Sequence, residues 1–310
     1  MGTFFRSGAT ALISGGASGV GFAMAKLCRK HGMHLALLDY NQANLAAAKK
    51  ELPPSDSLKT ETYEIDVGDL DAWKSLLPKF KERFDGKLDL LMLNAGTSVK
   101  PSTTQPYEDP EYFKKTLNTN MGGVLYGLSM FLPLLQESAK GSSKQGSHSV
   151  IITGSKQGIT NPPGGGNPAY NMSKSAIKTL AEHLAHDVRT EGSYSYAPGI
   201  SVHLLIPGWT YTGLSGNAGP TPSPEVLDKK NPGAWLPEQV AEYAEKKINE
   251  GKFYIVCPDN DVDEALDTAR MEWAIGDVAQ GRSALSRWDK KYEKEAAEGI
   301  KKRADELRGK

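Results

Sequence analysis

Short apolar runs recur along this chain, and glycine-rich turns or amphipathic polar stretches separate them. Such runs are typical of strands buried on both faces, as in parallel sheets. They predict strands at 9–14, 34–39, 61–65, 88–93, 200–206 and 253–256, and the pattern after the first run predicts a helix over 22–30 that stops near Gly32. Strands alternating with helices indicate parallel β–α–β units. The expected fold class is α/β, a doubly wound parallel sheet in three layers.

The C-terminal part has a different pattern. A single α/β domain over 1–257 accounts for the strands, and 258–310 is expected to be a helical extension. Helices are predicted at Asp263–Trp273 and Ser283–Arg308, the second heavily charged. This charged helix is interpreted either as a solvated helix or as an arm that packs on a second subunit. The arm is suggested by Trp288 and Tyr292, which would share a helix face four residues apart.

Charge and composition narrow the possible partners. Lys and Arg total 37, as do Asp and Glu, so the net charge is zero and favours neither nucleic acid nor an anionic membrane. No apolar window is long enough to span a membrane, and no signal peptide is evident. Cys28 and Cys257 lie in apolar runs and are expected to be core residues of a cytoplasmic protein in a reducing compartment.

A glycine-rich turn follows the first predicted strand at once. The segment 15–21 reads Gly-Gly-Ala-Ser-Gly-Val-Gly and leads into the predicted helix. A strand, a glycine turn and a helix N-terminus form a cradle for a diphosphate, because backbone N–H groups and the helix dipole face the anion. The next strand ends at Asp39. A carboxylate there would accept hydrogen bonds from ribose hydroxyls and repel a 2′-phosphate, which favours NAD over NADP.

Tyr170 and Lys174 stand four residues apart, and Ser155 precedes them. On a helix the phenol and the ammonium would share one face. A neighbouring cation favours phenolate, so Lys174 is expected to lower the pKa of Tyr170. Tyr243 and Lys247 have the same spacing, but no serine-bearing strand precedes them, and they are interpreted as a coincidence on a solvated face.

Taken together, these motifs resemble those of the short-chain dehydrogenase/reductase family. The resemblance covers roughly residues 5–257 and implies a Rossmann-type fold. Its motifs occur in the family's order: Ser14–Gly21, Asp66-Val67, Asn94-Ala95-Gly96, Asn120, Ile151–Gly158 with Ser155, Tyr170 with Lys174, and Pro207–Thr212. Ser14 stands where the family usually has Thr.

The resemblance also implies a role for each matching residue. Tyr170 would be the general acid or base, Lys174 would hold the ribose, Ser155 would bind the substrate oxygen, and Asn120 would hold a relay water. The expected cofactor-binding residues are Gly15, Ser18, Gly19, Val20, Gly21, Asp39, Asp66, Val67, Asn94, Ala95, Gly96, Tyr170, Lys174, Pro207, Gly208, Thr210 and Thr212.

Two loops allow alternative interpretations. The Pro- and Gly-rich segment 159–168 makes the interval from Ser155 to Tyr170 longer than the resemblance suggests, as a tolerated insertion or as part of the substrate mouth. Between 208 and 237, aromatic side chains either form a lid over an apolar substrate or pin the loop to the core. These aromatic side chains belong to Trp209, Tyr211 and Trp235, with Leu214 and Leu236 beside them.

The predicted function is therefore hydride transfer between NAD(H) and a secondary alcohol or ketone of a hydrophobic, aromatic or cyclic molecule. An NADP(H)-dependent ketoreductase and a non-catalytic NAD-binding regulator are the alternatives. His183 and His186 could share a ligand face, but no third ligand cluster accompanies them, and no metal is expected. The resemblance implies a homodimer or homotetramer.

Overall fold

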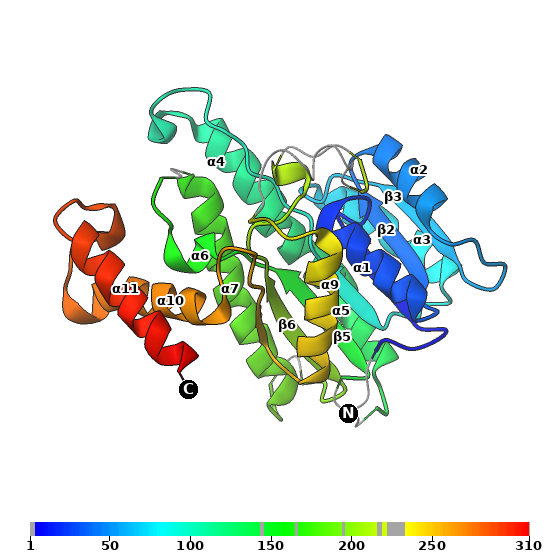
Figure 1. Ribbon diagram of the computed structural model, residues 1–310. Coiled ribbons are helices and arrows are strands. Elements are labelled where there is room, and N and C mark those ends of the chain that lie inside the picture. Colours follow the sequence, from blue (N-terminus) through cyan, green and yellow to red (C-terminus); the bar gives the residue numbers. More distant parts are fainter. Residues whose placement is uncertain are drawn as a thin grey trace.

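The computed structural model describes residues 4–142, 146–164, 167–193, 196–215, 219–221 and 233–309. Seven strands of this part form one parallel sheet in the order β3-β2-β1-β4-β5-β6-β7. Figure 1 shows this sheet with helices packed around it. They are β1 (Thr10–Ser14), β2 (His34–Asp39), β3 (Thr60–Glu64), β4 (Leu90–Leu93), β5 (His148–Thr153), β6 (Ile200–Ile206) and β7 (Tyr254–Val256). The predicted α/β class and parallel sheet are confirmed, with shifts of one or two residues at some strand ends.

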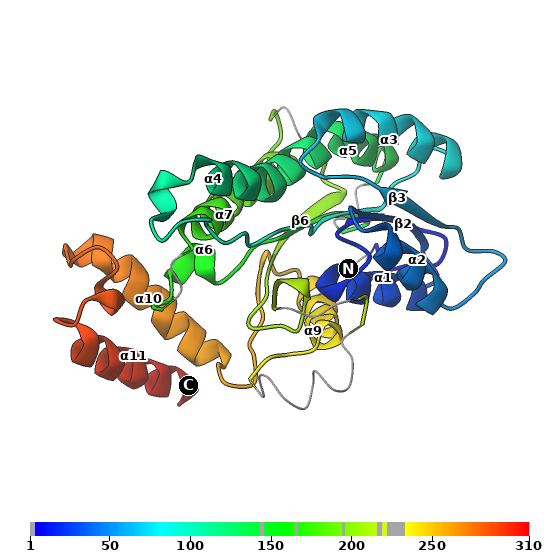
Figure 2. The same ribbon diagram turned by 90° about the horizontal axis from the view of Figure 1, so that it is seen from above.

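Helices cover both faces of the sheet, so the predicted three layers are also confirmed (Figure 2). One face carries α1 (Gly19–Lys30), α2 (Gln42–Glu51) and α9 (Pro237–Asn249). The other carries α3 (Leu70–Arg83), α5 (Gly123–Ser138) and α7 (Pro168–Arg189). Each helix turns an apolar stripe toward the strands, which is why the layers bury one another.

The core lies on both sides of the strands. In β1, Leu12 packs into the core under α3, α5 and α7, whereas Ala11 and Ile13 pack under α1 and α9. All three side chains are fully buried. A strand covered on both faces has few positions for a polar side chain, so the middle of β1 is apolar and its polar residues, Thr10 and Ser14, stand at its two ends.

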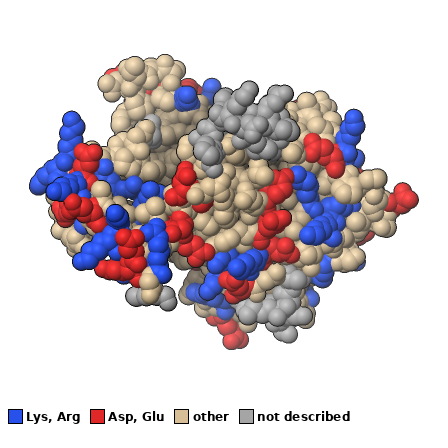
Figure 3. All heavy atoms as spheres, in the orientation of Figure 1, with Lys and Arg blue, Asp and Glu red and all other residues tan. Residues whose placement is uncertain are grey.

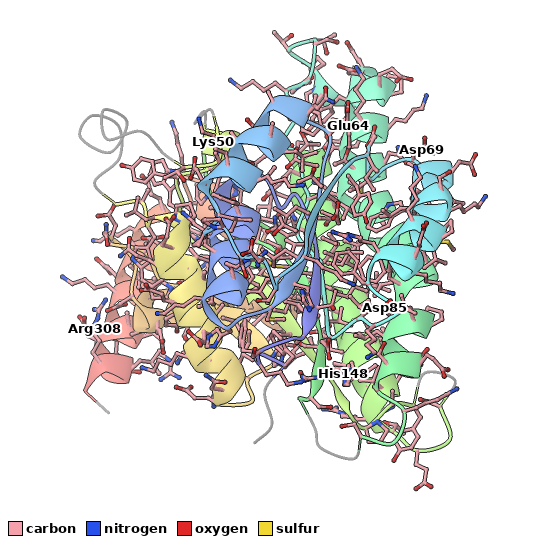
Figure 4. All side chains as sticks on the ribbon, turned by 90° about the vertical axis from the view of Figure 1, so that its right-hand side faces the viewer. Lys50, Glu64, Asp69, Asp85, His148 and Arg308 are labelled. Atoms are coloured by element: carbon pink, nitrogen blue, oxygen red, sulfur yellow. The ribbon has the colours of Figure 1, made fainter. Side chains whose placement is uncertain are left out.

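Shorter helices lie around the carboxyl edge of the sheet. They are 3-10 helix η1 (Pro106–Glu108), α4 (Pro110–Leu117), π-helical η2 (Asn118–Gly122), α6 (Gln157–Thr160) and 3-10 helix η3 (Gly213–Ser215). Figure 4 distinguishes the two edges: Glu64, at the carboxyl end of β3, lies near Asp69 at the top of the view, while His148, at the start of β5, lies toward the bottom. Ligands of doubly wound sheets bind at the carboxyl edge.

The C-terminal extension forms a helical hairpin beside α6, at the left of Figure 1. It consists of α10 (Glu264–Gln280), 3-10 helix η4 (Ser286–Trp288) and α11 (Glu293–Arg308). The two long helices bury Ala269, Ile300 and Ala304 between them. As Figure 3 shows, the extension carries Lys, Arg, Asp and Glu side chains intermixed over its surface.

The prediction of one helix over 283–308 is wrong in its first ten residues. Leu285 adopts a left-handed conformation with φ of 53°, and the Ser286 backbone N–H donates to Asp277. Trp288 therefore lies in η4, whereas Tyr292 precedes α11, and the two do not share one helical face. Trp288 donates its ring N–H to the Asn161 carbonyl oxygen of the same chain at 2.8 Å.

Two further findings concern the described residues. None of their helices is long and apolar enough to cross a bilayer. Cys28 and Cys257 are both buried as free thiols, as expected for core residues.

Candidate active site

The glycine turn connects β1 to α1 at the carboxyl edge. Gly15 and Gly19 have φ of +61° and +52°, a conformation that favours glycine. A Cβ atom at Gly21 would lie 2.1 Å from the Gly15 carbonyl oxygen, so glycine is required there for the helix to pack on the turn. Val20 is buried behind them.

The first turn of α1 is available to an anion. Its N-cap, Ser18, makes no side-chain cap hydrogen bond, and the first turn holds no acidic residue. Uncapped N–H groups and the positive end of the helix dipole therefore face the carboxyl edge. Thr212 lies against this turn, because a Cβ at Gly19 would come within 3.0 Å of its Cγ2. The turn fits a diphosphate between Gly15–Gly21 and Thr212.

Asp39 lies at the end of β2, next to the glycine turn. It is buried, and its carboxylate accepts hydrogen bonds from Ala17 N at 3.4 Å and Asn41 N at 3.1 Å. Burial raises the pKa of Asp39, and the two backbone N–H groups oppose that rise. The carboxylate retains lone pairs for further donors such as ribose hydroxyls.

Asp66 and Val67 follow β3 on the same side of the site. Asp66 accepts a hydrogen bond from Gly68 N at 2.8 Å, which shapes the turn. Val67 is buried, and its carbonyl oxygen accepts the ring N–H of Trp73 at 2.8 Å. These contacts hold the segment where an adenine ring would lie if the diphosphate occupied the glycine turn.

Asn94, which follows β4, connects three neighbouring strands. Its amide nitrogen donates to the carbonyl oxygens of Ser14 at 3.3 Å and Gly15 at 3.4 Å, and its oxygen accepts the Thr153 hydroxyl at 3.0 Å. The Ser14 hydroxyl accepts from the backbone N–H groups of Asn94 and Ala95. The carboxyl ends of β1, β4 and β5 are thereby fixed relative to one another.

Ser155, Tyr170 and Lys174 come together beyond β5. A side-chain hydrogen bond joins Ser155 and Tyr170. Lys174 is buried, with its Nζ donating to the Thr153 carbonyl oxygen at 2.8 Å and lying 5.7 Å from the centre of the Tyr170 ring. Asn167 caps α7 by accepting the Tyr170 backbone N–H at 3.2 Å, which fixes where the helix begins.

Burial dominates the electrostatics of this trio. It raises the pKa of Tyr170, although the Ser155 hydrogen bond acts in the opposite direction. It lowers the pKa of Lys174 to about 8. The net pKa of Tyr170 is thus raised and not lowered in the chain by itself, because desolvation of the phenolate dominates, while the Lys174 amine donates to Thr153; a lowering by Lys174 with the cofactor bound stays a prediction.

Asn120 lies in η2, where α4 passes into α5, and it is fully buried. Its side-chain oxygen accepts Thr97 N at 2.7 Å, and its nitrogen donates to Thr97 O at 3.0 Å and to the Ser173 hydroxyl at 2.9 Å. A Cβ at Gly96 would lie 3.3 Å from Asn120 Oδ1 and 3.5 Å from Lys174 Nζ. Gly96 thus keeps the space in front of both groups free.

The segment Pro207–Thr212 lies across from the glycine turn, with Thr212 against Gly19. The Thr210 hydroxyl donates to the Gly208 carbonyl oxygen at 3.1 Å, and a Cβ at Gly208 would lie 2.7 Å from the Asp259 carboxylate. In the loop that follows, Tyr211 is buried and Trp235 packs against the core, whereas Trp209 and Leu214 are each 52% exposed. Tyr211 and Trp235 thus pin the loop to the core, whereas a lid over an apolar substrate stays a prediction; residues 216–218 and 222–232 lie outside the described residues.

Tyr243 and Lys247 do not form a second site. The Tyr243 hydroxyl donates to Glu264, Lys247 lies 3.4 Å from the same carboxylate, and the Tyr243 ring packs edge-on against Trp235. The interpretation as a solvated-face coincidence is therefore incomplete, because this pair joins α9 to the start of α10. For the described part of the chain, no group of three or more His, Cys, Asp or Glu side chains could hold a metal ion.

The sequence interpretation missed the supporting role of several residues. Ser14, Thr153 and Ser173 hold the site together through the hydrogen bonds given above, and polar residues that end buried strands could have indicated the first two. Lys156, next to Ser155, forms a buried ion pair with Asp267 at 2.6 Å. No sequence pattern joins residues so far apart.

Comparison with known proteins agrees with this geometry. The family model for short chain dehydrogenases matches residues 9–223. Oxidoreductase asL5 of Sarocladium schorii is 29% identical over 84% of this chain and 96% of its own length. Levodione reductase of Leifsonia aquatica is 30% identical over 71% of this chain and 74% of its own.

A solved structure shares the fold over almost the whole chain. The short-chain dehydrogenase/reductase of Burkholderia phymatum, in complex with NAD, is 26% identical with a TM-score of 0.73 and covers 91% of this chain and 98% of its own. The family model, the seven-stranded parallel sheet and the glycine turn agree with one another. The chain belongs to the short-chain dehydrogenase/reductase family of nicotinamide-dependent oxidoreductases.

Proposed function

We propose that this protein transfers hydride between NAD(H) and a secondary alcohol or ketone of a hydrophobic small molecule. The observation that carries the proposal is the meeting of Ser155, Tyr170 and Lys174 at the carboxyl edge, with Ser155 and Tyr170 hydrogen-bonded and Lys174 one turn along α7. A hydroxyl and a phenol that lie this close together can both form hydrogen bonds to one substrate oxygen.

The residues around the crevice fit a nicotinamide dinucleotide. The uncapped start of α1 and the glycine turn would hold the diphosphate, with Thr210 and Thr212 opposite. Asp66 and Val67 would face the adenine, and Asn94–Gly96, Pro207 and Gly208 would flank the nicotinamide. A bound cofactor supplies the site with a hydride donor or acceptor.

Asp39 supports NAD(H) as the cofactor. Its carboxylate stands at the end of β2 and is oriented by Ala17 N and Asn41 N. A carboxylate in that place accepts hydrogen bonds from a ribose diol and repels a 2′-phosphate.

The chain's own groups would move and hold the proton. Because its pKa is raised, Tyr170 is a neutral phenol near neutral pH, ready to protonate the oxygen of a ketone undergoing reduction. Ser155 would donate a hydrogen bond to the same oxygen and stabilise the charge that develops on it. Lys174 would hold the ribose and favour phenolate in the oxidative direction, with Asn120 connecting its surroundings to solvent through water.

The exposed side chains near Pro207–Thr212 support a hydrophobic substrate. Trp209 follows Gly208 directly and is half exposed, as is Leu214. When a ligand covers large apolar side chains at the rim of a site, the removal of their surface from water favours binding. The similar levodione reductase is named for the reduction of a ketone.

Spectrophotometry tests the proposal directly. NADH formation is followed with cyclic and aromatic secondary alcohols, and NADH oxidation with the matching ketones, with NADP(H) in parallel. Tyr170→Phe is expected to abolish turnover and leave NADH binding, measured by fluorescence, unchanged. Turnover retained by Tyr170→Phe would refute the assignment. Preference for NADP(H) would refute the cofactor, and NADH binding without turnover on any substrate would favour a regulatory role.

A further inference from the structure

Lys156 follows Ser155 and points into the protein interior. Its side chain is 15% exposed, and its Nζ lies 2.6 Å from Asp267 and 3.6 Å from Asp259. Asp267 belongs to α10 of the C-terminal extension, and Asp259 follows β7. Their side chains are 4% and 8% exposed. We refer to Lys156, Asp259 and Asp267 as the Lys156 cluster.

The Lys156 cluster also touches the segment after β6. The Asp259 carboxylate accepts the backbone N–H of Trp209 at 3.1 Å. A Cβ at Gly208 would lie 2.7 Å from that carboxylate and 2.9 Å from Lys156 Nζ, so only glycine lets the segment pack this closely. The cluster therefore joins four pieces of chain: the Ser155 turn, the Gly208 segment, the segment after β7 and α10.

A buried charge is stable only when an oppositely charged or hydrogen-bonding group lies close to it. A charge removed from water costs free energy unless an opposite charge lies close, so the partners must stay within a narrow range of positions. Lys156 leaves the chain one residue after Ser155. The position of its ammonium group between Asp267 and Asp259 consequently constrains the backbone from which the Ser155 hydroxyl extends.

The extension reaches the same region at a second point. The ring N–H of Trp288 donates to the Asn161 carbonyl oxygen at 2.8 Å, just after α6. The Asn161 side chain in turn accepts from Asn171 on α7 at 3.0 Å. Asn161 has a φ of 40°, a left-handed conformation that these contacts help to hold.

We propose that Lys156 and Asp267 are positioning residues for Ser155, so that the C-terminal extension is part of the support of the active site. The proposal rests on the proposed function only in that Ser155 contacts the substrate oxygen. Displacement of a catalytic group by about 1 Å can lower the rate about a hundredfold, so loss of this support should be visible in turnover.

The test compares two carboxylate-to-amide changes on α10. Asp267→Asn removes the charge facing Lys156, whereas Glu272→Gln removes one facing Arg303 on the surface of the same extension. We expect kcat to fall about tenfold or more in Asp267→Asn, with the Kd for NADH within about twofold of wild type. Glu272→Gln should resemble wild type, and Lys156→Arg should retain more activity than Lys156→Met.

Hydrogen exchange provides a readout that does not depend on turnover. Asp267→Asn should speed amide exchange in peptides spanning 153–160 and 207–212, and Glu272→Gln should not. If Asp267→Asn does not fold, Trp288→Phe, which removes a single N–H donor, should speed exchange at 157–164. Exchange and kinetics that match Glu272→Gln would overturn the proposal. Faster exchange in a protein that turns over no substrate would support the positioning role and count against the proposed function.

Discussion

Lys174 donates from its ammonium group to the carbonyl oxygen of Thr153, at a distance of 2.8 Å. This contact joins α7 to the last residue of β5, two residues before Ser155. The amine is held by backbone rather than by a carboxylate, so burial is the only cause that lowers its pKa, to about 8.

This lowered pKa predicts a pH-dependent stability. Between about pH 8 and its ordinary value of 10.5, Lys174 binds more protons in the unfolded chain than in the folded one, so stability rises with pH. Relative to Lys174→Met, the wild type should gain about 3 kcal/mol in free energy of unfolding from pH 7 to above pH 10. Urea unfolding of both proteins at the two pH values measures this gain, and an unchanged difference would contradict it.

Gly21→Ala should damage the glycine turn. The new Cβ would meet the Gly15 carbonyl oxygen at 2.1 Å, so α1 or the turn must move. We expect a loss of about 1–3 kcal/mol in stability, and weaker NADH binding than that loss alone explains. Thermal unfolding and NADH titration measure both effects. Gly213→Ala is the control, because a Cβ there meets nothing within 4 Å; equal effects of the two changes would contradict the prediction.

Asp39→Ser should change the choice of cofactor. It removes a carboxylate that would accept ribose hydrogen bonds and repel a 2′-phosphate. The ratio of kcat/KM for NAD to that for NADP should fall about 10–100-fold, as expected for charge-assisted hydrogen bonds. Initial rates with both cofactors measure the ratio. Asp66→Asn is the control and should affect both cofactors alike; an unchanged ratio in Asp39→Ser would remove Asp39 from the cofactor site.

Asn120→Ala should affect stability and turnover together. It removes three hydrogen bonds of a fully buried side chain, to Thr97 N, Thr97 O and the Ser173 hydroxyl, and leaves those groups without their partner. We expect about 3 kcal/mol of destabilisation and a lower kcat. Asn118→Ala, in the same π-helical turn, removes one exposed hydrogen bond to Gly68 and should cost less than 1 kcal/mol, about the usual net value. Equal costs would show that burial of Asn120 is unimportant.

Local patterns explain what could be predicted from the sequence. A strand buried on both faces is mostly apolar, so β2 and β6 were located to the residue, although β6 also contains Ser201 and His203. The glycine turn was evident because its backbone conformation and close packing exclude other residues. Ser155, Tyr170 and Lys174 were identified because the family resemblance adds a serine-bearing strand to a helical spacing that Tyr243 and Lys247 also have.

Contacts between distant segments could not be predicted in this way. The break before α11 depends on the hydrogen bond from Ser286 N to Asp277 and on that from the Trp288 ring to the Asn161 carbonyl oxygen. Neither contact produces a periodic pattern of apolar residues in the sequence. The pKa of Tyr170 was expected to fall because the sequence spacing indicates that Lys174 is near. The spacing does not indicate how deeply the phenol is buried, and burial raises its pKa. Asp267 was overlooked because an acidic residue on a predicted surface helix ordinarily faces solvent.

Asn94 lies at the seam between the two halves of the sheet, where its amide meets the ends of β1 and β5 at once. The glycine turn is on one side of that seam, and the Ser155 segment is on the other. The side-chain amide of Asn94 therefore contacts both halves of the sheet, and a backbone shift at the end of β1 or β5 would change the hydrogen bonds that this one side chain makes. The outer loops can therefore accept substitutions that leave these hydrogen bonds unchanged. A substitution at Asn94 or Thr153 alone would leave a hydrogen-bonding group without its partner, so the two positions are expected to change together.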